Sequence, residues 1–480
     1  MQNDSGLYRR ILKATGLFGG VQSITVLCSL VRNKVIAVLL GPEGVGIISL
    51  FNSATDVVSS VTGLGLRQSG VRDVSAARAA GGSGMMRIIS VLRRLSLFTG
   101  LLGAMIFIGA APLLSRITFG SDRYIWGFVF LSASLLLNAL TGGEQAVLQG
   151  GEKLKLLARS SVAGSILSLA ISVPLYYFFG MAGIVPSLIA ASLSTYIFAA
   201  IYSRRTYPPS EKITARIAFR EGTPMMRLGI YMTISGFITT LLNYVLIAWL
   251  NRYSSTADVG LYQSGYTLVS RYVGLIFIAM SSEYYPRLSA VSSDNAETSR
   301  QVSRQIETTL LLLAPLATLF LMFQNEIINL LYDKTFNMAT RYTGWAITGV
   351  LFKGISWSLG FVLLAKSQGR LFLITEFISD TTSFIINILF YTIWGLEGLG
   401  AAFLLNFVLY TILIWGLCAV RYGFRPEKRM YSVLTTTTIL VAAVFILLRI
   451  PALYGIPLAS AVTLATLIYS VTIIKKRVEK

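Results

Sequence analysis

Apolar segments of about twenty residues recur along the 480-residue chain. An α-helix needs about 20 apolar residues to cross the ~30 Å hydrocarbon core of a bilayer. The segments are too long, and too little alternating, for strands of a membrane β-barrel. The sequence therefore predicts an all-α integral membrane fold with about 14 transmembrane helices. These are expected at 14–38, 47–66, 88–111, 124–148, 156–179, 183–203, 228–250, 258–281, 305–325, 342–365, 371–394, 398–420, 431–448 and 456–474.

Composition agrees with lipid as the solvent. Charged residues make up 13% of the chain, against roughly 25% in soluble proteins, and 54% of the residues are hydrophobic. Histidine is absent, and the two cysteines, Cys28 and Cys418, lie inside apolar segments. This excludes histidine catalysis, most zinc sites and a disulfide framework, so neither a catalytic nor a metal site is expected. The polar start of the chain predicts no removable signal peptide.

The formal net charge of +20 sets the orientation. In a soluble protein such a charge would suggest nucleic acid as the partner. Here 29 of the 41 Lys and Arg residues fall in alternate loops on one side, and six fall on the other. The positive-inside rule then places both termini in the cytoplasm of a multi-pass membrane protein, and it accounts for most of the charge with no nucleic acid partner.

The chain contains an internal repeat. Three pairs of segments match at similar offsets: FFGMAGIVPSL (178–188) with IWGLEGLGAAF (393–403) at 215, VLQGGEKLKLL (147–157) with LAKSQGRLFLI (364–374) at 217, and LGPEGVGIISLF (40–51) with SSTADVGLYQSG (254–265) at 214. Two pseudo-symmetric six-helix lobes follow, with a pseudo-axis along the membrane normal. The expected parts are an N-terminal lobe (1–203), a cytoplasmic linker (204–227), a C-terminal lobe (228–420) and two extra helices (421–480).

Six cations lie inside expected helices rather than in loops: Arg32, Lys34, Arg93, Arg94, Arg271 and Lys353. Lys34, Arg93 and Arg94 are close enough to helix ends to snorkel. A cation near mid-bilayer costs about 2.5–3.5 kcal/mol and normally faces a cavity or a partner. Arg32, Arg271 and Lys353 are therefore the candidate functional cations.

Polar residues at helical spacing accompany these cations and predict wet helix faces. The faces contain Gln22, Thr25, Ser29 and Arg32; Asn52, Asp56, Ser59 and Gly63; Gly236, Thr240 and Asn243; Gln263, Thr267, Ser270, Arg271 and Gly274; and Gly349, Lys353, Ser356, Trp357 and Gly360. At the repeat offsets, Arg32 maps to Leu246, Arg271 to Val57 and Lys353 to Leu136. The fold is therefore expected to accept an apolar residue at each position.

Several motifs resemble the multidrug/oligosaccharidyl-lipid/polysaccharide (MOP) exporter superfamily. They are LGPEGVGIISLF, ADVGLYQSGY and EYYPRLS, and NLLYDKTF followed by WAITGVLFKGISWSLGFVLLAKSQGRLFLITE, which resembles the O-antigen and lipid III flippases. The resemblance implies two six-helix lobes around a central cavity that opens alternately to each side. It also implies an undecaprenyl-pyrophosphate-linked oligosaccharide as cargo, moved from the cytoplasmic to the periplasmic leaflet. The extra C-terminal helices resemble a pair in lipid II flippases that helps form a tail-binding groove.

A pyrophosphate headgroup suits the candidate cations, because arginine grips phosphate oxygens with paired hydrogen bonds. We expect Arg32, Arg271 and Lys353 to bind it, with Asn52, Asn243 and Trp357 also facing substrate. Trp345 is a further candidate for stacking on sugar. The alternative for the arginines is an ion pair with Asp56. Asp56, Glu376 and Asp380 are candidate coupling sites for a proton or sodium gradient. The alternative for Glu376 and Asp380 is pairing with Lys366 or Arg370.

Two other functional classes remain alternatives. A cation-coupled multidrug exporter of the same superfamily would need carboxylates in its cavity, whereas the charges inside the helices are mainly positive. A glycan ligase or polymerase would need a long outer loop with acidic or histidine chemistry, and the longest such loop is short (325–341). The chain is therefore not expected to be an enzyme or to hold a cofactor. A polymerase and other glycan-assembly membrane proteins are its expected partners.

Overall fold

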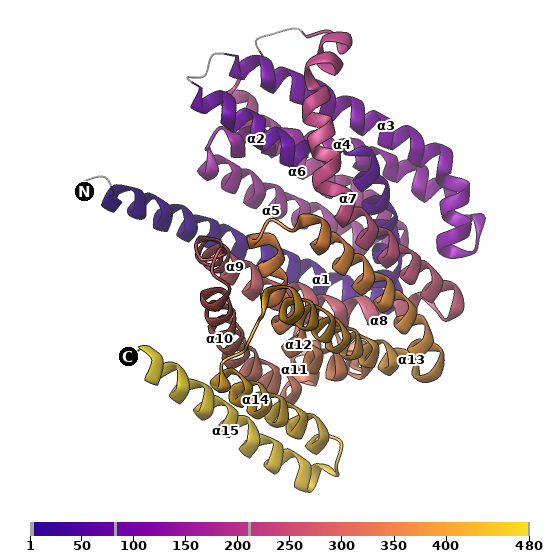
Figure 1. The fold of residues 1–480 in the computed structure, drawn as a ribbon. Coiled ribbons are helices and arrows are strands. Elements are labelled where there is room, and N and C mark those ends of the chain that lie inside the picture. The colour runs from indigo at the N-terminus through magenta and orange to yellow at the C-terminus, as the bar shows by residue number, and fades with distance from the viewer. Residues whose placement is uncertain (1–3, 81–83, 210–212, 479–480) are drawn as a thin grey trace. The chain divides into compact units, whose positions relative to one another are not determined.

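A computed structural model describes residues 4–80, 84–209 and 213–478, and these ranges contain helices and no strand. The α-helices (Figure 1) are α1 (Asp4–Thr62), α2 (Leu66–Ala79), α3 (Met85–Phe119), α4 (Ile125–Gly150), α5 (Leu154–Phe179), α6 (Ile184–Thr206), α7 (Ala215–Tyr253), α8 (Thr256–Tyr266), α9 (Val273–Ala290), α10 (Asn295–Met322), α11 (Gln324–Leu331), α12 (Thr340–Ala365), α13 (Gly369–Tyr422), α14 (Lys428–Leu447) and α15 (Ala452–Val478). Short helical turns lie at η1 (Asp122–Tyr124), η2 (Gly180–Gly183), η3 (Thr267–Tyr272) and η4 (Lys334–Ala339). The predicted all-α fold is confirmed.

The length and the apolar composition of the helices identify the candidate membrane spans. Within the described ranges, nine helices are long and apolar enough to cross a membrane. Helices α1 and α13 each contain two expected helices, because the backbone breaks at Gly41 (φ 64°, ψ −167°) and at Gly395 (φ 59°, ψ −138°). Pro42 follows the first break, where a missing N–H costs no hydrogen bond. The count of fourteen transmembrane helices stays a prediction.

The chain divides into two compact units, Met1–Gly260 (unit 1) and Leu261–Lys480 (unit 2). In unit 1, α4 packs against α3 and α6, α5 packs against α1 and α6, and α7 contacts α1, α2 and α3. Aromatic rings of Phe51, Phe107 and Phe128 form part of its core, with ring centroids 5.0 and 5.5 Å apart. The lobe boundaries expected at 203, 227 and 420 stay a prediction.

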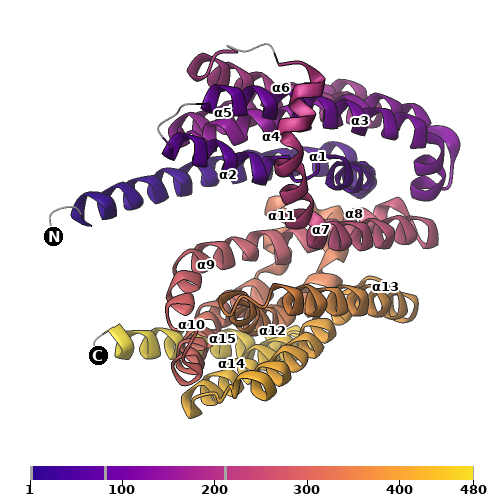
Figure 2. The same ribbon diagram turned by 45° about the horizontal axis from the view of Figure 1, so that its top comes forward.

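In unit 2, α12 packs along α13, and α10 contacts α12, α14 and α15. The last two helices, α14 and α15, lie side by side in both views (Figures 1 and 2). The extra C-terminal helices are therefore packed parts of unit 2.

The two units repeat the same local geometry. Helices α4 and α12 begin and end 215 residues apart, at 125 and 340 and at 150 and 365. The turns at Gly180 and Gly395 share a backbone conformation, with φ of 52° and 59° and ψ of −129° and −138°. A Cβ atom at Gly183 would meet the carbonyl oxygen of Leu175, and one at Gly398 would meet that of Phe390, again 215 residues further on. The predicted repeat is confirmed.

The structure also corrects the register of one repeat pair. After α4, Lys153 N donates to Leu148 O at 2.8 Å, and after α12, Gln368 N donates to Leu363 O at 2.8 Å. The positions with positive φ, Glu152 and Ser367, are likewise 215 apart. The offset of 217 is therefore wrong by two residues. Weak sequence similarity does not fix the register of this pair, whereas the hydrogen bonds of the turn do. The counterpart of Lys353 becomes the polar Asn138, not Leu136.

Candidate functional site

Unit 1 contains a polar cavity of about 640 Å³. Residues from α1, α2, α3, α4, α6 and α7 line it, and most carry hydroxyl or amide groups or are glycine. The polar lining includes Ser59, Ser60, Thr62, Gln68, Ser96, Thr99, Asn138, Thr141, Gln145, Thr195, Thr233 and Thr240. Hydroxyl-rich walls at membrane depth need water or a polar ligand, because lipid cannot hydrogen-bond to them.

A second cavity of about 240 Å³ surrounds Arg32. It adjoins the first, because Asn138 and Thr195 line both. Arg32 Nη1 donates to Ser168 Oγ at 3.5 Å, which is a weak contact for a guanidinium. No carboxylate lines either cavity, and no ion pair joins Arg32 to Asp56 or to any other described side chain. Arg32 is thus a cation in a hydroxyl-lined cavity, an arrangement suited to an anion.

Three expected helix faces contribute to these cavities. Thr25 and Ser29 line the Arg32 cavity, and Gly236 and Thr240 line the larger one. Ser59 and Gly63 also line the larger cavity, followed four residues later by Arg67. Arg67, on α2 beyond the turn at 63–65, was not predicted as a site residue, because the sequence groups it with the cations of an inner loop.

Other expected site residues in unit 1 lie outside the cavity walls. Asn52 and Asp56 are exposed on α1, and Asn243 is half-buried on α7. The side chains of Gln22 and Arg271 lie outside the described residues. The cavity expected between the two lobes stays a prediction, as do the substrate roles of these residues.

In unit 2, Lys353 faces aromatic rings. Its Nζ lies 5.7 Å from the ring centre of Phe403 and 5.3 Å from that of Phe407. It forms no ion pair with any described carboxylate. Cation–π contacts contribute about 0.5–2 kcal/mol, less than the cost of burying an ammonium group. The packing around Lys353 therefore does not by itself explain why a charged residue occupies this position.

Trp357 and Trp345 differ in their surroundings. Trp357 is half-buried against Phe277, Tyr284 and Phe361, with ring centroids 5.3, 5.8 and 4.9 Å away. Trp345 Nε1 instead donates to Glu397 Oε1 at 2.8 Å. Both indoles thus have protein partners, and their stacking on sugar stays a prediction.

Glu376 and Asp380 are half-buried one turn apart on α13. Glu376 accepts a hydrogen bond from the hydroxyl of Tyr410. Lys366 donates to Ser292 O at 2.5 Å and to Asn295 Oδ1 at 2.8 Å, and within the described side chains it makes no ion pair with Glu376. The structure therefore contradicts the alternative in which Lys366 neutralises Glu376.

A sequence profile of the family described as "Polysaccharide biosynthesis protein" matches residues 35–341. The chain belongs to this family. It is 21% identical over 389 residues to the lipid III flippases of Escherichia coli (strain K12) and Shigella flexneri, covering 81% of this chain and 93% of theirs.

Solved structures share the fold of this polysaccharide biosynthesis protein. A structure of the lipid II flippase MurJ in an inward closed conformation matches with a TM-score of 0.71 and 14% identity, covering 97% of this chain and 100% of that one. An inward-facing multidrug resistance MATE transporter of the MOP superfamily matches with a TM-score of 0.65 and 16% identity, covering 83% and 94%. The fold is therefore shared with a lipid II flippase and with a multidrug transporter of the MOP superfamily, and these relatives are transporters or flippases by name.

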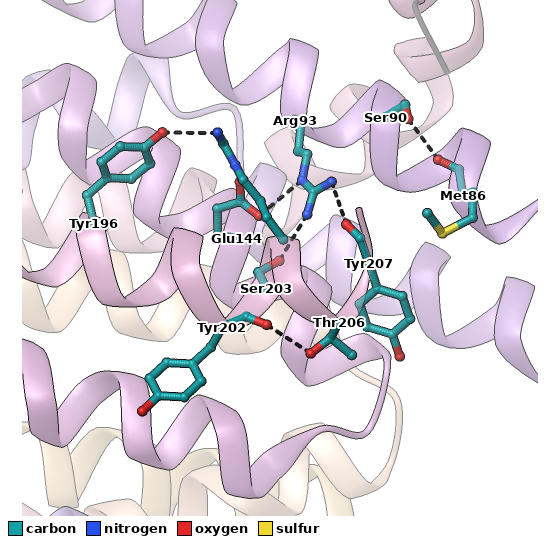
Figure 3. A network of polar contacts seen from close by, with 10 residues as sticks. Met86, Ser90, Arg93, Glu144, Tyr196, Tyr202, Ser203, Thr206 and Tyr207 are labelled. Carbon is teal, nitrogen blue, oxygen red and sulfur yellow. Dashed lines mark hydrogen bonds and ion pairs between the residues drawn. The ribbon is translucent and has the colours of Figure 1, made fainter. Parts of the chain in front are cut away.

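This family member also contains a buried charge network that was not predicted from the sequence (Figure 3). Glu144 on α4 accepts from Arg93 Nε at 3.0 Å and from Arg204 Nε at 2.9 Å, one through each oxygen. Arg93 also donates to Tyr207 O at 3.0 Å and to Ser203 Oγ at 3.1 Å. Arg93 is thus paired rather than snorkelling. A lone carboxylate in an apolar helix was the available signal.

The network fixes the helices that form the larger cavity. Glu144 lies between two lining residues, Gly143 and Gln145, and Arg93 lies one turn before the lining residue Ser96. Its partners connect α3, α4 and α6. The charges of this network are therefore satisfied by protein, whereas that of Arg32 is available to a ligand.

Proposed function

We propose that this chain is a flippase for an undecaprenyl-pyrophosphate-linked oligosaccharide of the O-antigen or enterobacterial common antigen type. It would move this cargo from the cytoplasmic to the periplasmic leaflet by alternating access. The observation that carries the proposal is Arg32, a cation in a polar cavity of unit 1 that has no carboxylate partner among the described residues. The names of the lipid III and lipid II flippases among its relatives support the same cargo class.

The cations and the hydroxyl and amide groups of the cavities match different parts of the cargo. Arg32 would donate paired hydrogen bonds to pyrophosphate oxygens, with Arg271 and Lys353 as further cations. The hydroxyl and amide groups of the larger cavity would exchange hydrogen bonds with sugar hydroxyls. The isoprenoid tail would stay in the lipid hydrocarbon during transport, so its apolar surface would not be exposed to water.

The cellular setting follows from the same proposal. The protein would lie in the bacterial inner membrane with both termini in the cytoplasm, beside a polymerase and other glycan-assembly membrane proteins. It would need no bound cofactor. A proton or sodium gradient would drive release, with Asp56, Glu376 and Asp380 as candidate carriers.

The test is Arg32→Ala in the native host. Loss of the charge-assisted hydrogen bonds, each about 1.5–3 kcal/mol, should lower headgroup affinity about 10- to 100-fold and reduce surface glycan. Lipid-linked precursor should accumulate in the cytoplasmic leaflet. Arg123→Ala, which removes an exposed cation that lines neither cavity, is the matched control.

Normal surface glycan in a correctly inserted Arg32→Ala, Arg271→Ala, Lys353→Ala triple variant would refute the proposal.

A multidrug exporter is the second candidate, favoured by the half-buried carboxylates Glu376 and Asp380. It predicts resistance to organic cations and dye efflux on expression, with both lost in Glu376→Gln. We expect neither, because cations line the cavities of unit 1.

A further inference from the structure

Unit 2 contains a cavity of about 330 Å³ where α10, α11 and α12 meet the bend of α13 and the end of α14. Its charged lining residues are Arg341, Glu397 and Arg449. All three belong to segments that the charge distribution predicts to be on the outer side of the membrane. The volume lies in the range of small-molecule sites.

Arg449 is held by side-chain contacts in this cavity. Its Nη2 donates to Glu397 Oε1 at 2.5 Å, and its guanidinium carbon lies 4.8 and 4.4 Å from the ring centres of Trp345 and Phe445. Trp345 Nε1 donates to the same carboxylate oxygen at 2.8 Å. Because the side chain of Arg449 is still half-exposed, its remaining N–H groups can reach a ligand without reorganisation.

The cavity also contains acceptors that lack donors. Both bonds to Glu397 use Oε1, so within the described residues Oε2 accepts none. Gln324 Oε1 is buried, and none of the described residues donates to it. Arg341 is exposed at the start of α12, near Glu397 but without an ion pair to it. Two cations and one carboxylate therefore leave one net positive charge beside two unused acceptors.

We propose that this cavity binds an acidic sugar, one carboxylate-bearing residue of a glycan. The ligand's carboxylate would meet Arg341 and Arg449, and its hydroxyls would donate to Glu397 Oε2 and Gln324 Oε1. A chloride or sulfate ion has no donors for these acceptors. A neutral sugar leaves the net positive charge without a partner.

This inference rests on the proposed function in one respect, that a glycan arrives on the outer side. It gives the extra helices a role, because Phe445, Leu448 and Arg449 at the end of α14 form one wall. Without α14 the cavity would lose both its stacked cation and the ring that orients it. The acidic sugar therefore contacts a part of the chain that lies outside the repeat.

The test is direct binding to the purified full-length protein in lipid nanodiscs. The probes are a trisaccharide of galacturonic acid and its carboxyl-reduced neutral counterpart. We expect the acidic probe to bind at least tenfold more tightly than the neutral one, and Arg341→Gln to remove this difference. Arg341 forms no ion pair with a described carboxylate, so this variant should fold even if Arg449→Gln does not. Lys334→Gln, an exposed cation of the same unit outside the cavity, should bind like wild type.

A second pair of variants tests the cavity by volume. A Cβ atom at Gly344 would lie 3.6 Å from Phe445 and 3.7 Å from Gln324 Oε1, so alanine fits. Gly344→Leu should occupy the cavity and abolish binding, whereas Gly344→Ala should retain it. Equal affinity for the two probes, or equal loss in Arg341→Gln and Lys334→Gln, would overturn the inference. Because no transport is measured, that failure would leave the Arg32 test of the flippase untouched.

Discussion

Neutralising Glu144 should destabilise unit 1 strongly. Its side chain is 3% exposed and accepts from both Arg93 and Arg204. Glu144→Gln keeps the shape but leaves Arg93, which is 14% exposed, as a buried charge without a counter-ion. Removing one partner of a buried ion pair costs about 3–5 kcal/mol. At roughly 2–4 °C per kcal/mol, the apparent Tm should fall by about 10 °C.

The two arginines should contribute unequally to this network. Arg204 is 48% exposed, so Arg204→Gln should cost less than about 1 kcal/mol, because water screens its charge. Arg93→Gln should cost about as much as Glu144→Gln, since it leaves the carboxylate buried with one partner. The exposed pair of Arg78 and Glu152 supplies the control Glu152→Gln, with little change expected.

The assay is thermal unfolding of the purified protein in detergent, followed by size-exclusion chromatography of the fraction that stays monodisperse. The double variant Glu144→Gln, Arg93→Gln should recover part of the loss, which measures the coupling between the two groups. A wild-type Tm for Glu144→Gln would refute the reasoning. So would equal losses in Arg93→Gln and Arg204→Gln, because burial would then have no role.

Two further predictions concern a turn and a cation. Gly65→Ala should lower stability by more than about 2 kcal/mol, because φ is 60° and the new Cβ would meet the backbone of Gly229. Gly84→Ala, at φ 83° with open space around it, should lose only about 1 kcal/mol, and equal Tm values for the two would contradict this. Lys353→Met should leave Tm unchanged or raised, because an apolar side chain replaces a costly charge, while surface glycan falls at least tenfold. Lys334→Met is its control, and undiminished glycan in Lys353→Met would remove Lys353 from the site.

The spans, the repeat and the polar faces were predictable because each depends on local sequence. A bilayer requires about 20 apolar residues in succession, and a helix brings residues three and four apart to one face. Thr25, Ser29 and Arg32 therefore line one cavity as their spacing predicts. The kinks at Gly41 and Gly395 were likewise expected as helix boundaries, although the chain continues in helix beyond them.

Only the tertiary structure decided which charges are available to a ligand. Arg93 and Arg32 both lie inside expected helices, but helix packing places Arg93 against Glu144, 51 residues away, and places Arg32 beside Ser168 with no described carboxylate as a partner. Lys353 meets rings 50 and 54 residues further along the chain. Such pairings depend on how helices cross and which side chains then face each other, and no local pattern encodes them. The sequence by itself therefore determined that cations lie within the membrane, and the packing determined which of them are neutralised.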